Sequence, residues 1–189
     1  MTTVYFVRHA EPNYANHDDA SRELTPKGMA DRLRVTAFFA DKPIDAVLSS
    51  PYKRAYDTVK HFADSRGLPI ATDIRFCERR ISGGWIEDFA AYCRRSWEDF
   101  DYRMDGGECL REVQERNAAA LRDVLSAHRD QHIVIGSHGT ALSTLINRFD
   151  PSFGYDNFMR IRDRMPWIVR FTFDGDAFLS LEEQELPEP

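Results

Sequence analysis

Short apolar runs rich in β-forming residues alternate along this chain with helix-start signals, and three of the runs end in basic or histidine residues. Alternating strands and helices favour an α/β fold built on a parallel sheet. In such a sheet the carboxyl ends of neighbouring strands lie at one edge, where α/β proteins bind ligands. The sequence therefore predicts that the side chains at these three strand ends meet. The runs are 3–7, 44–50 and 132–137, and the residues that follow them include Arg8-His9, Arg54 and His138-Gly139.

The other elements fit the same plan. Thr25 before Pro26 is a typical N-cap followed by proline at the first helical position, and it predicts a helix to about residue 40. Alternation over 167–173 and a turn at 174–176 predict a terminal β-hairpin. We expect a three-layer α/β/α sandwich with a mixed, mostly parallel sheet. Further helices are expected over 51–66 and 110–125, a short strand over 69–72, and the second hairpin strand over 177–181.

The segment 79–105 is less regular, with aromatic residues among mixed charges, including Trp85, Tyr92 and Trp97. We interpret it as a helical excursion that covers the site. No composition shift or linker divides the chain, so a single domain is expected over 1–189.

Composition excludes several classes of protein. A net charge of -6 argues against nucleic-acid or membrane-surface binding, which depend on an excess of Lys and Arg. No apolar run approaches the roughly 20 residues of a membrane span, and the chain enters its first strand without a signal segment, so a cytoplasmic protein is expected. Three cysteines without CxxC spacing suggest reduced thiols rather than disulfides or a zinc site. The sequence carries no signal for oligomeric state.

The residue types at the strand ends suit chemistry on a phosphate. A neutral histidine nitrogen can attack phosphorus and carry the phosphoryl group covalently. Arginine guanidinium groups stabilise the negative charge that spreads over the phosphoryl oxygens, and helix N-termini favour anions. A carboxylic acid is needed in addition, to donate a proton to the departing alcohol.

Five motifs in order resemble the histidine phosphatase superfamily, in its phosphoglycerate mutase-like branch. They extend to residue 139, nearly three quarters of the chain. The motifs are RHAE at 8–11, LTPKG at 24–28, SSPYKRAYDT at 49–58, GGEC at 106–109 and SHG at 137–139.

The resemblance implies that His9 accepts the phosphoryl group, with Arg8, Arg54 and His138 completing the phosphate pocket. In this family the acid follows a short apolar-x-Glu pattern, which Phe76-Cys77-Glu78 matches, making Glu78 the expected acid. Three other glutamates compete for that role, although one of them is better placed to cap the start of the following helix. The competitors are Glu11, Glu87 and Glu108, and Glu108 is the expected cap. No metal or other cofactor is implied.

The chain departs from the family pattern in three places, the first of them directly after Arg8-His9. Ala10-Glu11-Pro12 stands where the family has Gly-Glu-Thr/Ser, so a phosphate-binding hydroxyl is absent, and Asn13 or Asn16 would have to substitute for it. Gly139 suggests close backbone approach at the site. The family's Gly-x-Trp-Glu-Gly is present only as residues 83–87, and GGES has become GGEC.

These observations predict a phosphatase of the histidine acid phosphatase type, which hydrolyses a small phosphorylated substrate through a phosphohistidine on His9. Phosphoglycerate mutase-type transfer is the first alternative, although mutases of the family tend to be longer. A protein phosphohistidine phosphatase is the second. A non-catalytic phospholigand-binding protein, from a different functional class, is the third.

Overall fold

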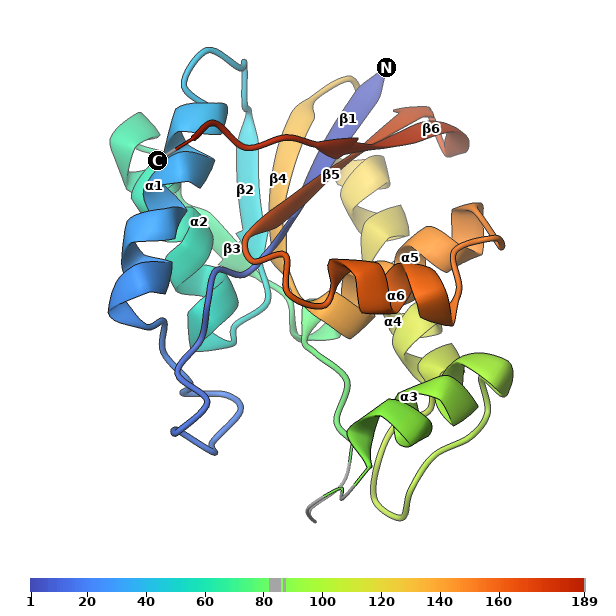
Figure 1. Ribbon diagram of the computed structural model, residues 1–189. Coiled ribbons are helices and arrows are strands. Elements are labelled where there is room, and N and C mark those ends of the chain that lie inside the picture. The colour runs from blue at the N-terminus through green and yellow to red at the C-terminus, as the bar shows by residue number, and fades with distance from the viewer. Residues whose placement is uncertain (82–85, 87, 189) are drawn as a thin grey trace.

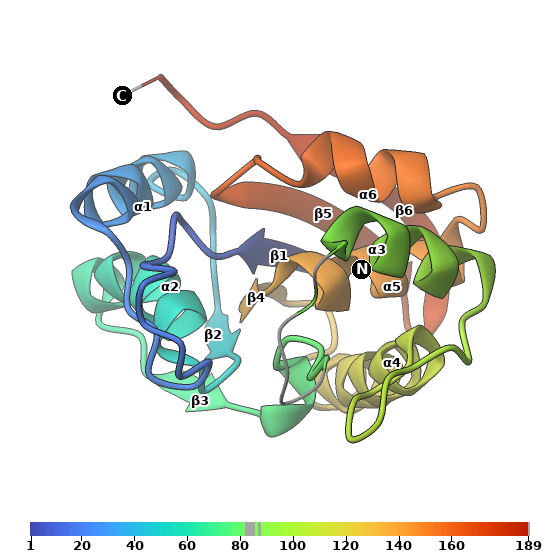
Figure 2. The same ribbon diagram turned by 60° about the horizontal axis from the view of Figure 1, so that its bottom comes forward.

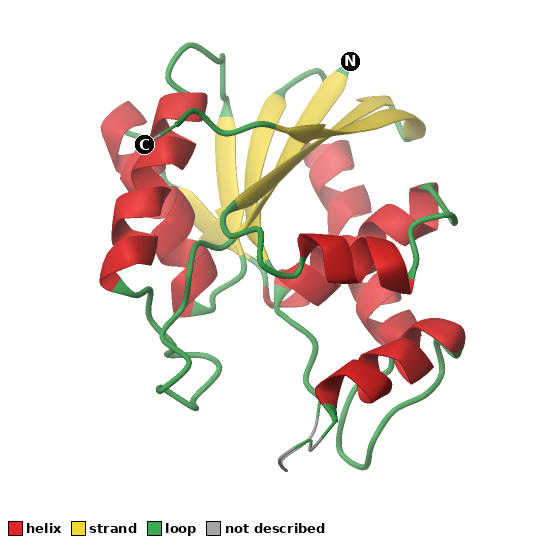
Figure 3. Cartoon of the chain, in the orientation of Figure 1, coloured by secondary structure: helices red, strands yellow, loops and turns green. Residues whose placement is uncertain are grey.

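The computed structural model describes residues 1–81, 86 and 88–188, and the strands within them form a six-stranded sheet in the order β3-β2-β4-β1-β5-β6 (Figures 1 and 3). Its strands are β1 (Thr2–Arg8), β2 (Ala46–Ser49), β3 (Ile70–Thr72), β4 (His132–Ser137), β5 (Trp167–Asp174) and β6 (Ala177–Gln184). The helices are α1 (Pro26–Phe38), α2 (Lys53–Arg66), the 3-10 turn η1 (Ile74–Phe76), α3 (Phe89–Glu98), α4 (Leu110–Ala127), α5 (Gly139–Phe149) and α6 (Tyr155–Ile161).

Four neighbouring strands are parallel. β1 pairs with β4, β4 with β2, and β2 with β3, all in the same direction. The C-terminal hairpin adds β5 antiparallel to β1, and β6 antiparallel to β5. The predicted mixed, mostly parallel sheet is therefore confirmed.

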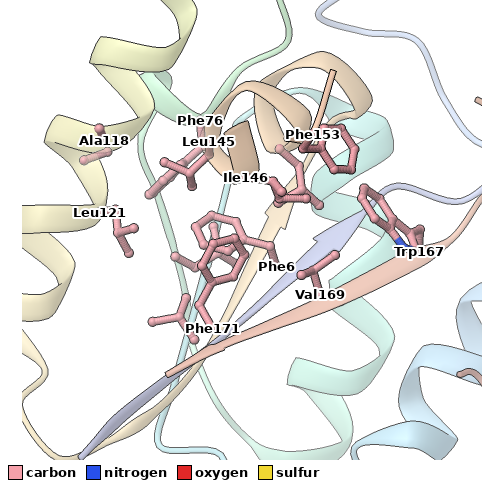
Figure 4. Packing of buried hydrophobic residues seen from close by; sticks show 14 of the residues in the cluster. Phe6, Phe76, Ala118, Leu121, Leu145, Ile146, Phe153, Trp167, Val169 and Phe171 are labelled. Carbon is pink, nitrogen blue, oxygen red and sulfur yellow. The ribbon is translucent and has the colours of Figure 1, made fainter. Parts of the chain in front are cut away.

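Side chains of the central strands alternate between two helical layers, as the two-residue period of a strand requires. On β1, Val4 and Phe6 join the core cluster on the α4 and α5 side, whereas Tyr5 and Val7 join the cluster that packs on α1 and α2. The packing of Phe6 with Val169 and Phe171 of β5 is visible in Figure 4. Because both faces of β1 are buried, its position at the sheet centre is fixed, and the three-layer sandwich is confirmed.

Helix ends follow local chemistry. The Thr25 hydroxyl accepts a hydrogen bond from the backbone N–H of Gly28, and Pro26 occupies the first turn, as expected. The helix ends at Phe38, slightly before the expected residue 40. α2 begins at Lys53 and ends at Arg66, and it is capped by Gly67, whose φ of 65° is a left-handed conformation that glycine adopts without strain.

Helix α6 was not expected from the sequence. It has seven residues, too few for a clear helical period, and it is held by burial of Phe158 and Ile161 in the core. The Phe158 ring lies 5.7 Å from that of Trp97, between centroids, so α6 packs beside α3. The helical character expected of 79–105 is present as α3, whereas Trp85 and the Gly83-Gly84 pair lie outside the described residues.

Within the described ranges, no helix is both long enough and apolar enough to cross a membrane. Cys77, Cys93 and Cys109 are buried free thiols.

Candidate active site

The carboxyl ends of β1, β2 and β4 meet at one edge of the sheet, as predicted. Arg8 is paired with Ser137 at the ends of β1 and β4, and Ser49 of β2 is paired with Gly136. In Figure 2, which brings this edge forward, β1 ends between α1 and α2 on one side and α5 and α6 on the other. His9 and His138 directly follow two of these ends.

A cleft of about 670 Å³ opens at this edge. Five of the predicted site residues line it: Arg8, His9, Arg54, Glu78 and Gly139. Four more arginines and two more carboxylates join them, namely Arg22, Arg79, Arg80, Arg162, Asp19 and Asp163. The cleft is therefore strongly cationic, although the chain carries a net charge of -6.

His9 is buried, and its Nδ1 lies 2.8 Å from the carbonyl oxygen of Ala10. A carbonyl can only accept, so Nδ1 carries the proton and donates it in this bond. Burial lowers the pKa of His9 well below its usual value, and the charges of Arg54 and Arg8 lower it further. The ring is therefore neutral at pH 7, with its lone pair on Nε2.

His138 is fully buried as the N-cap residue of α5, and its ring centroid lies 5.3 Å from that of His9. Its Nε2 is 2.8 Å from the hydroxyl oxygen of Ser50. Its Nδ1 is buried without a hydrogen-bond partner among the described residues. Burial, followed by the charge of Arg54, lowers the pKa of His138 well below its usual value.

The guanidinium of Arg8 is anchored by backbone carbonyls at the C-terminal end of α6 and just after it. Its Nη1 donates to the carbonyl oxygens of Ile161, at 2.6 Å, and Arg164, at 3.3 Å. A Cβ on Gly139 would lie 3.1 Å from Nε of Arg8 and 3.2 Å from its Nη2. The close approach expected at Gly139 is therefore to the guanidinium of Arg8, for which the missing side chain leaves room.

Arg54 lies in the first turn of α2 and is almost completely buried. Its Nη1 donates to the backbone carbonyl of Asp19 at 2.6 Å and lies 3.0 Å from the carboxylate of the same residue. Arg22 donates to that carboxylate as well, at 2.9 Å. The loop that follows the first motif thus brings a carboxylate to an arginine of the pocket.

The Glu78 side chain packs against the N-terminus of α5. Its carboxylate accepts hydrogen bonds from the backbone N–H groups of Thr140 at 3.0 Å, Ala141 at 3.1 Å and Arg79 at 2.8 Å. Arg116 of α4 donates to the carbonyl oxygen of Glu78 at 3.1 Å. The N–H groups of α5 therefore hold the Glu78 carboxylate at the cleft wall, and Arg116 of α4 holds its backbone.

The family model of the histidine phosphatase superfamily (branch 1) matches residues 4–182. The chain belongs to this superfamily. The predicted resemblance is confirmed, and the match extends beyond the motifs into the C-terminal hairpin. The chain is accordingly an enzyme of the superfamily, a phosphatase or a mutase.

Its relatives carry the names of both kinds of enzyme. Phosphoserine phosphatase 1 of Hydrogenobacter thermophilus is 24% identical over 182 residues, which cover 83% of each chain. A protein named probable phosphoglycerate mutase GpmB, from Salmonella typhi, is 27% identical over 161 residues, covering 78% of this chain and 74% of its own.

Solved structures share the fold. YhfR of Bacillus stearothermophilus superposes with a TM-score of 0.77 at 24% identity, over 95% of both chains. A phosphoserine phosphatase from Entamoeba histolytica, solved with phosphoserine, has a TM-score of 0.76 at 20% identity, over 98% of this chain and 96% of its own. The phosphoglycerate mutase-like fold is therefore confirmed.

Two of the three alternative acids, Glu11 and Glu108, have other partners in the structure. Glu11 accepts a hydrogen bond from the Thr25 hydroxyl at 2.7 Å and does not line the cleft, within the described part of the chain. Glu87 lies outside the described residues. Glu108 pairs with Arg116 at 2.9 Å.

The capping role expected of Glu108 belongs to Glu112. The carboxylate of Glu112 accepts from the backbone N–H of Cys109 at 2.8 Å, which completes a capping box at the start of α4. Glu108 instead accepts from the N–H of Arg80 and holds Arg116. Its neighbour Arg116 is thereby directed at the backbone that carries Glu78.

Asn13 and Asn16 are not among the described residues that line the cleft. Their amide groups donate to the two carboxylate oxygens of Glu23, at 2.6 Å and 2.8 Å. The bonds from Asn16 and Asn13 lower the pKa of Glu23 to about 2. These asparagines therefore order the loop rather than contribute donors to the cleft, and Arg22 of that loop lines the cleft instead.

Sequence reasoning missed Asp19, Arg22 and Arg116 as parts of the site. His17-Asp18-Asp19 is more consistent with a polar loop than with a metal site, and among the residues with described positions no group of three or more potential ligands is arranged for a metal. The antiparallel bridge between Pro12 and Leu24 closes this loop. Such a long-range pairing leaves no periodic signal in the sequence.

Proposed function

We propose that this chain hydrolyses small phosphomonoesters in two steps, by chemistry of the histidine acid phosphatase type, with His9 as the phosphoryl carrier. The hydrogen bond from His9 Nδ1–H to the Ala10 carbonyl is the observation that carries this proposal. It leaves the Nε2 lone pair available on a neutral ring at the wall of a cationic cleft.

In the first step, Nε2 of His9 attacks phosphorus and the bond from phosphorus to the ester oxygen breaks. The ester oxygen takes a proton from the carboxylic acid of Glu78 and leaves as an alcohol. In the second step, water attacks the phosphohistidine and gives a proton to the Glu78 carboxylate. The P–N bond then breaks, returning neutral His9 and releasing inorganic phosphate.

Three cationic or donor groups would bind the phosphoryl oxygens. Arg8 and Arg54 line the cleft beside His9, and their permanent charges stabilise a transition state whose charge spreads over three oxygens. His138 would add a hydrogen bond from its unpartnered Nδ1. Each guanidinium is anchored by backbone carbonyls, so little reorganisation is needed during the reaction.

The outer wall of the cleft favours a substrate with a second acidic group. Arg80 and Arg162 line it in addition to the arginines beside His9, and Phe89 and Phe158 supply apolar surface. Relatives are named for phosphoserine and phosphoglycerate, and the Entamoeba structures hold phosphoserine and 3-phosphoglyceric acid. A small phosphorylated carboxylic acid is the substrate class that we propose.

Mutase chemistry is the second candidate, because a relative is named for it and the same phosphohistidine could return its phosphoryl group to a sugar acid. Hydrolysis differs only in the acceptor, which is water. Incubation with 3-phosphoglycerate distinguishes them: a phosphatase releases inorganic phosphate, whereas a mutase accumulates 2-phosphoglycerate.

The test is a panel of phosphoserine, phosphoglycerates, phosphosugars, phosphohistidine peptides and p-nitrophenyl phosphate, combined with a rapid alkaline quench that traps labelled phosphate on the protein. We expect turnover and an acid-labile, alkali-stable label that is lost in His9→Ala. A label that survives in His9→Ala would move the nucleophile elsewhere. Preference for phosphohistidine peptides would indicate a protein phosphatase, and binding without turnover would indicate a non-catalytic phospholigand-binding protein.

A further inference from the structure

Ser50 lies behind His138, in contact with three polar groups at once. It follows β2 and is completely buried. Its hydroxyl oxygen is 2.8 Å from Nε2 of His138, 3.3 Å from the sulfur of Cys77 and 3.1 Å from the backbone nitrogen of Tyr52.

The hydrogen atoms in this cluster can be counted. The N–H of Tyr52 can only donate, so it uses one lone pair of the Ser50 oxygen. One lone pair and one hydrogen of Ser50 remain, to be divided between His138 and Cys77. Burial raises the pKa of the Cys77 thiol, which keeps its hydrogen at neutral pH.

Only two complete arrangements exist for a neutral His138. In the first, the Cys77 thiol donates to Ser50, and Ser50 donates to Nε2 of His138, whose proton must then be on Nδ1. In the second, Nε2–H donates to Ser50, and Ser50 donates to the sulfur. The two differ in whether Nδ1 of His138 is a donor or an acceptor.

Nδ1 of His138 is the nitrogen that matters for a phosphoryl group. It is buried and has no partner among the described residues, and its ring faces His9 with 5.3 Å between centroids. Phosphoryl oxygens only accept hydrogen bonds. The first arrangement gives them a donor, whereas the second would place a lone pair against them.

We propose that Ser50 is a positioning residue that holds His138 as the tautomer with its proton on Nδ1, so that His138 donates to the phosphoryl group on His9. This inference rests on the proposed function of His9. In this arrangement the Cys77 thiol donates to the remaining lone pair of Ser50. Ser50 itself does not touch the substrate.

The first test reads the tautomer directly. The full chain, labelled with ¹⁵N-histidine, is examined by long-range ¹H–¹⁵N correlation NMR with saturating orthovanadate as a phosphoryl mimic. We expect the His138 signals, assigned from their loss in His138→Gln, to show protonated Nδ1 and unprotonated Nε2. A proton on Nε2, alone or with one on Nδ1, would overturn the assignment.

The second test uses kinetics with a matched control. Ser50→Ala should lower kcat by about tenfold or more, short of the 10²–10³-fold effect of deleting a transition-state donor outright. Ser49→Ala removes an equally buried hydroxyl whose bond is to the Ser50 carbonyl at 2.8 Å, and it should change kcat less than about twofold. Equal effects of the two substitutions on kcat would indicate that Ser50 has only a structural role.

A double-mutant cycle separates action through His138 from general damage. In a His138→Gln background, Ser50→Ala should change kcat less than about twofold, because the tautomer no longer exists to be lost. Full additivity would overturn the proposal. Wild-type protein that neither binds orthovanadate nor turns over any phosphoester would overturn the proposed function and this inference with it, whereas active wild type with the other tautomer overturns only the inference.

Discussion

The rings of His9 and His138 lie 5.3 Å apart with their planes inclined by 63°, and the backbone of the sheet fixes this spacing. The strands that carry them are adjacent and parallel, and the backbone N–H of His9 donates to the carbonyl of Ser137 at 3.1 Å. Two neutral imidazoles can share a buried site at this distance, whereas two imidazolium ions would repel each other.

Burial of these two histidines should make folding stability depend on pH. Burial, reinforced by arginine charge, lowers the pKa of both rings well below 6.5, whereas in the unfolded chain they titrate near that value. As pH falls below 6.5 the unfolded state gains protons that the native state does not accept. Stability should therefore be lost on acidification, by about 1 kcal/mol for each histidine between pH 7.5 and 5.5.

Urea unfolding at both pH values checks this expectation. His9→Gln and His138→Gln should each reduce the pH-dependent loss by about 1 kcal/mol, because glutamine does not titrate. His128→Gln, at the C-terminal end of α4, leaves both buried rings in place and serves as the control. An unchanged pH dependence in the His138 variant would mean that its ring takes up protons over this pH range in the native state as it does in the unfolded chain.

Glu78→Gln should distinguish substrates by their leaving groups. The alcohol of phosphoserine needs a proton as it departs, so its turnover should fall by about 10²–10⁴-fold. p-Nitrophenol leaves without protonation, so formation of the phosphoenzyme from its ester should fall far less. Single-turnover measurements of both substrates test this, because they separate the first step from hydrolysis of the intermediate.

Glu11→Gln is the matched control, since its carboxylate bonds to Thr25 and not to the start of α5. It should leave the ratio of the two substrates unchanged. If Glu78→Gln lowers both substrates equally in the first step, the acid is another residue, and Glu87→Gln becomes the variant to measure.

Asp19→Asn should strengthen anion binding. The Asp19 carboxylate lies 3.0 Å from Nη1 of Arg54 and competes with phosphate for that charge. Removing one negative charge while keeping the side-chain size should lower the inhibition constant of inorganic phosphate by about three- to tenfold, the scale of a partly exposed ion pair. Asp18→Asn, whose carboxylate bonds to Ser21 within the loop, is the control. Weaker phosphate binding in Asp19→Asn would assign the carboxylate to ordering Arg54.

Much of the site was predictable because strand ends are local features of the sequence. Arg8, His9 and His138 directly follow apolar runs, so a parallel sheet necessarily brings them to one edge. The same reasoning placed Arg54 in the first turn of a helix. These positions depend on hydrophobic pattern and helix-start chemistry, both of which act over a few residues.

The features that could not be predicted from the sequence depend on contacts between distant segments. Glu23 accepts hydrogen bonds from the amides of Asn13 and Asn16, in a loop that is closed by the bridge between Pro12 and Leu24. Helix α6 is similarly held by packing against Trp97 rather than by its own period. Local propensity cannot indicate such interactions, because the same residues have several polar or apolar partners available.

Gly139→Ala should impair catalysis through Arg8. The added Cβ would lie 3.1 Å from Nε, and 3.2 Å from Cζ and Nη2 of the Arg8 guanidinium. That guanidinium cannot simply retreat, because its Nη1 is held by the carbonyls of Ile161 and Arg164. We expect kcat/KM to fall by about tenfold or more for every phosphoester, since misplacing a charge-stabilising group raises the transition-state energy whatever the leaving group.

Gly154→Ala is the matched control. A Cβ there would meet no atom within 4 Å, and its φ of -121° is accessible to alanine. It should leave kcat/KM unchanged, with at most about 1 kcal/mol of stability lost at the start of α6. Full activity in Gly139→Ala with unaltered phosphate inhibition would show that Arg8 can shift without cost. The exact position of its guanidinium would then not contribute to stabilising the transition state. A loss confined to phosphoserine, with p-nitrophenyl phosphate unaffected, would instead place the disturbance at Glu78, whose carboxylate accepts from the next two N–H groups of α5.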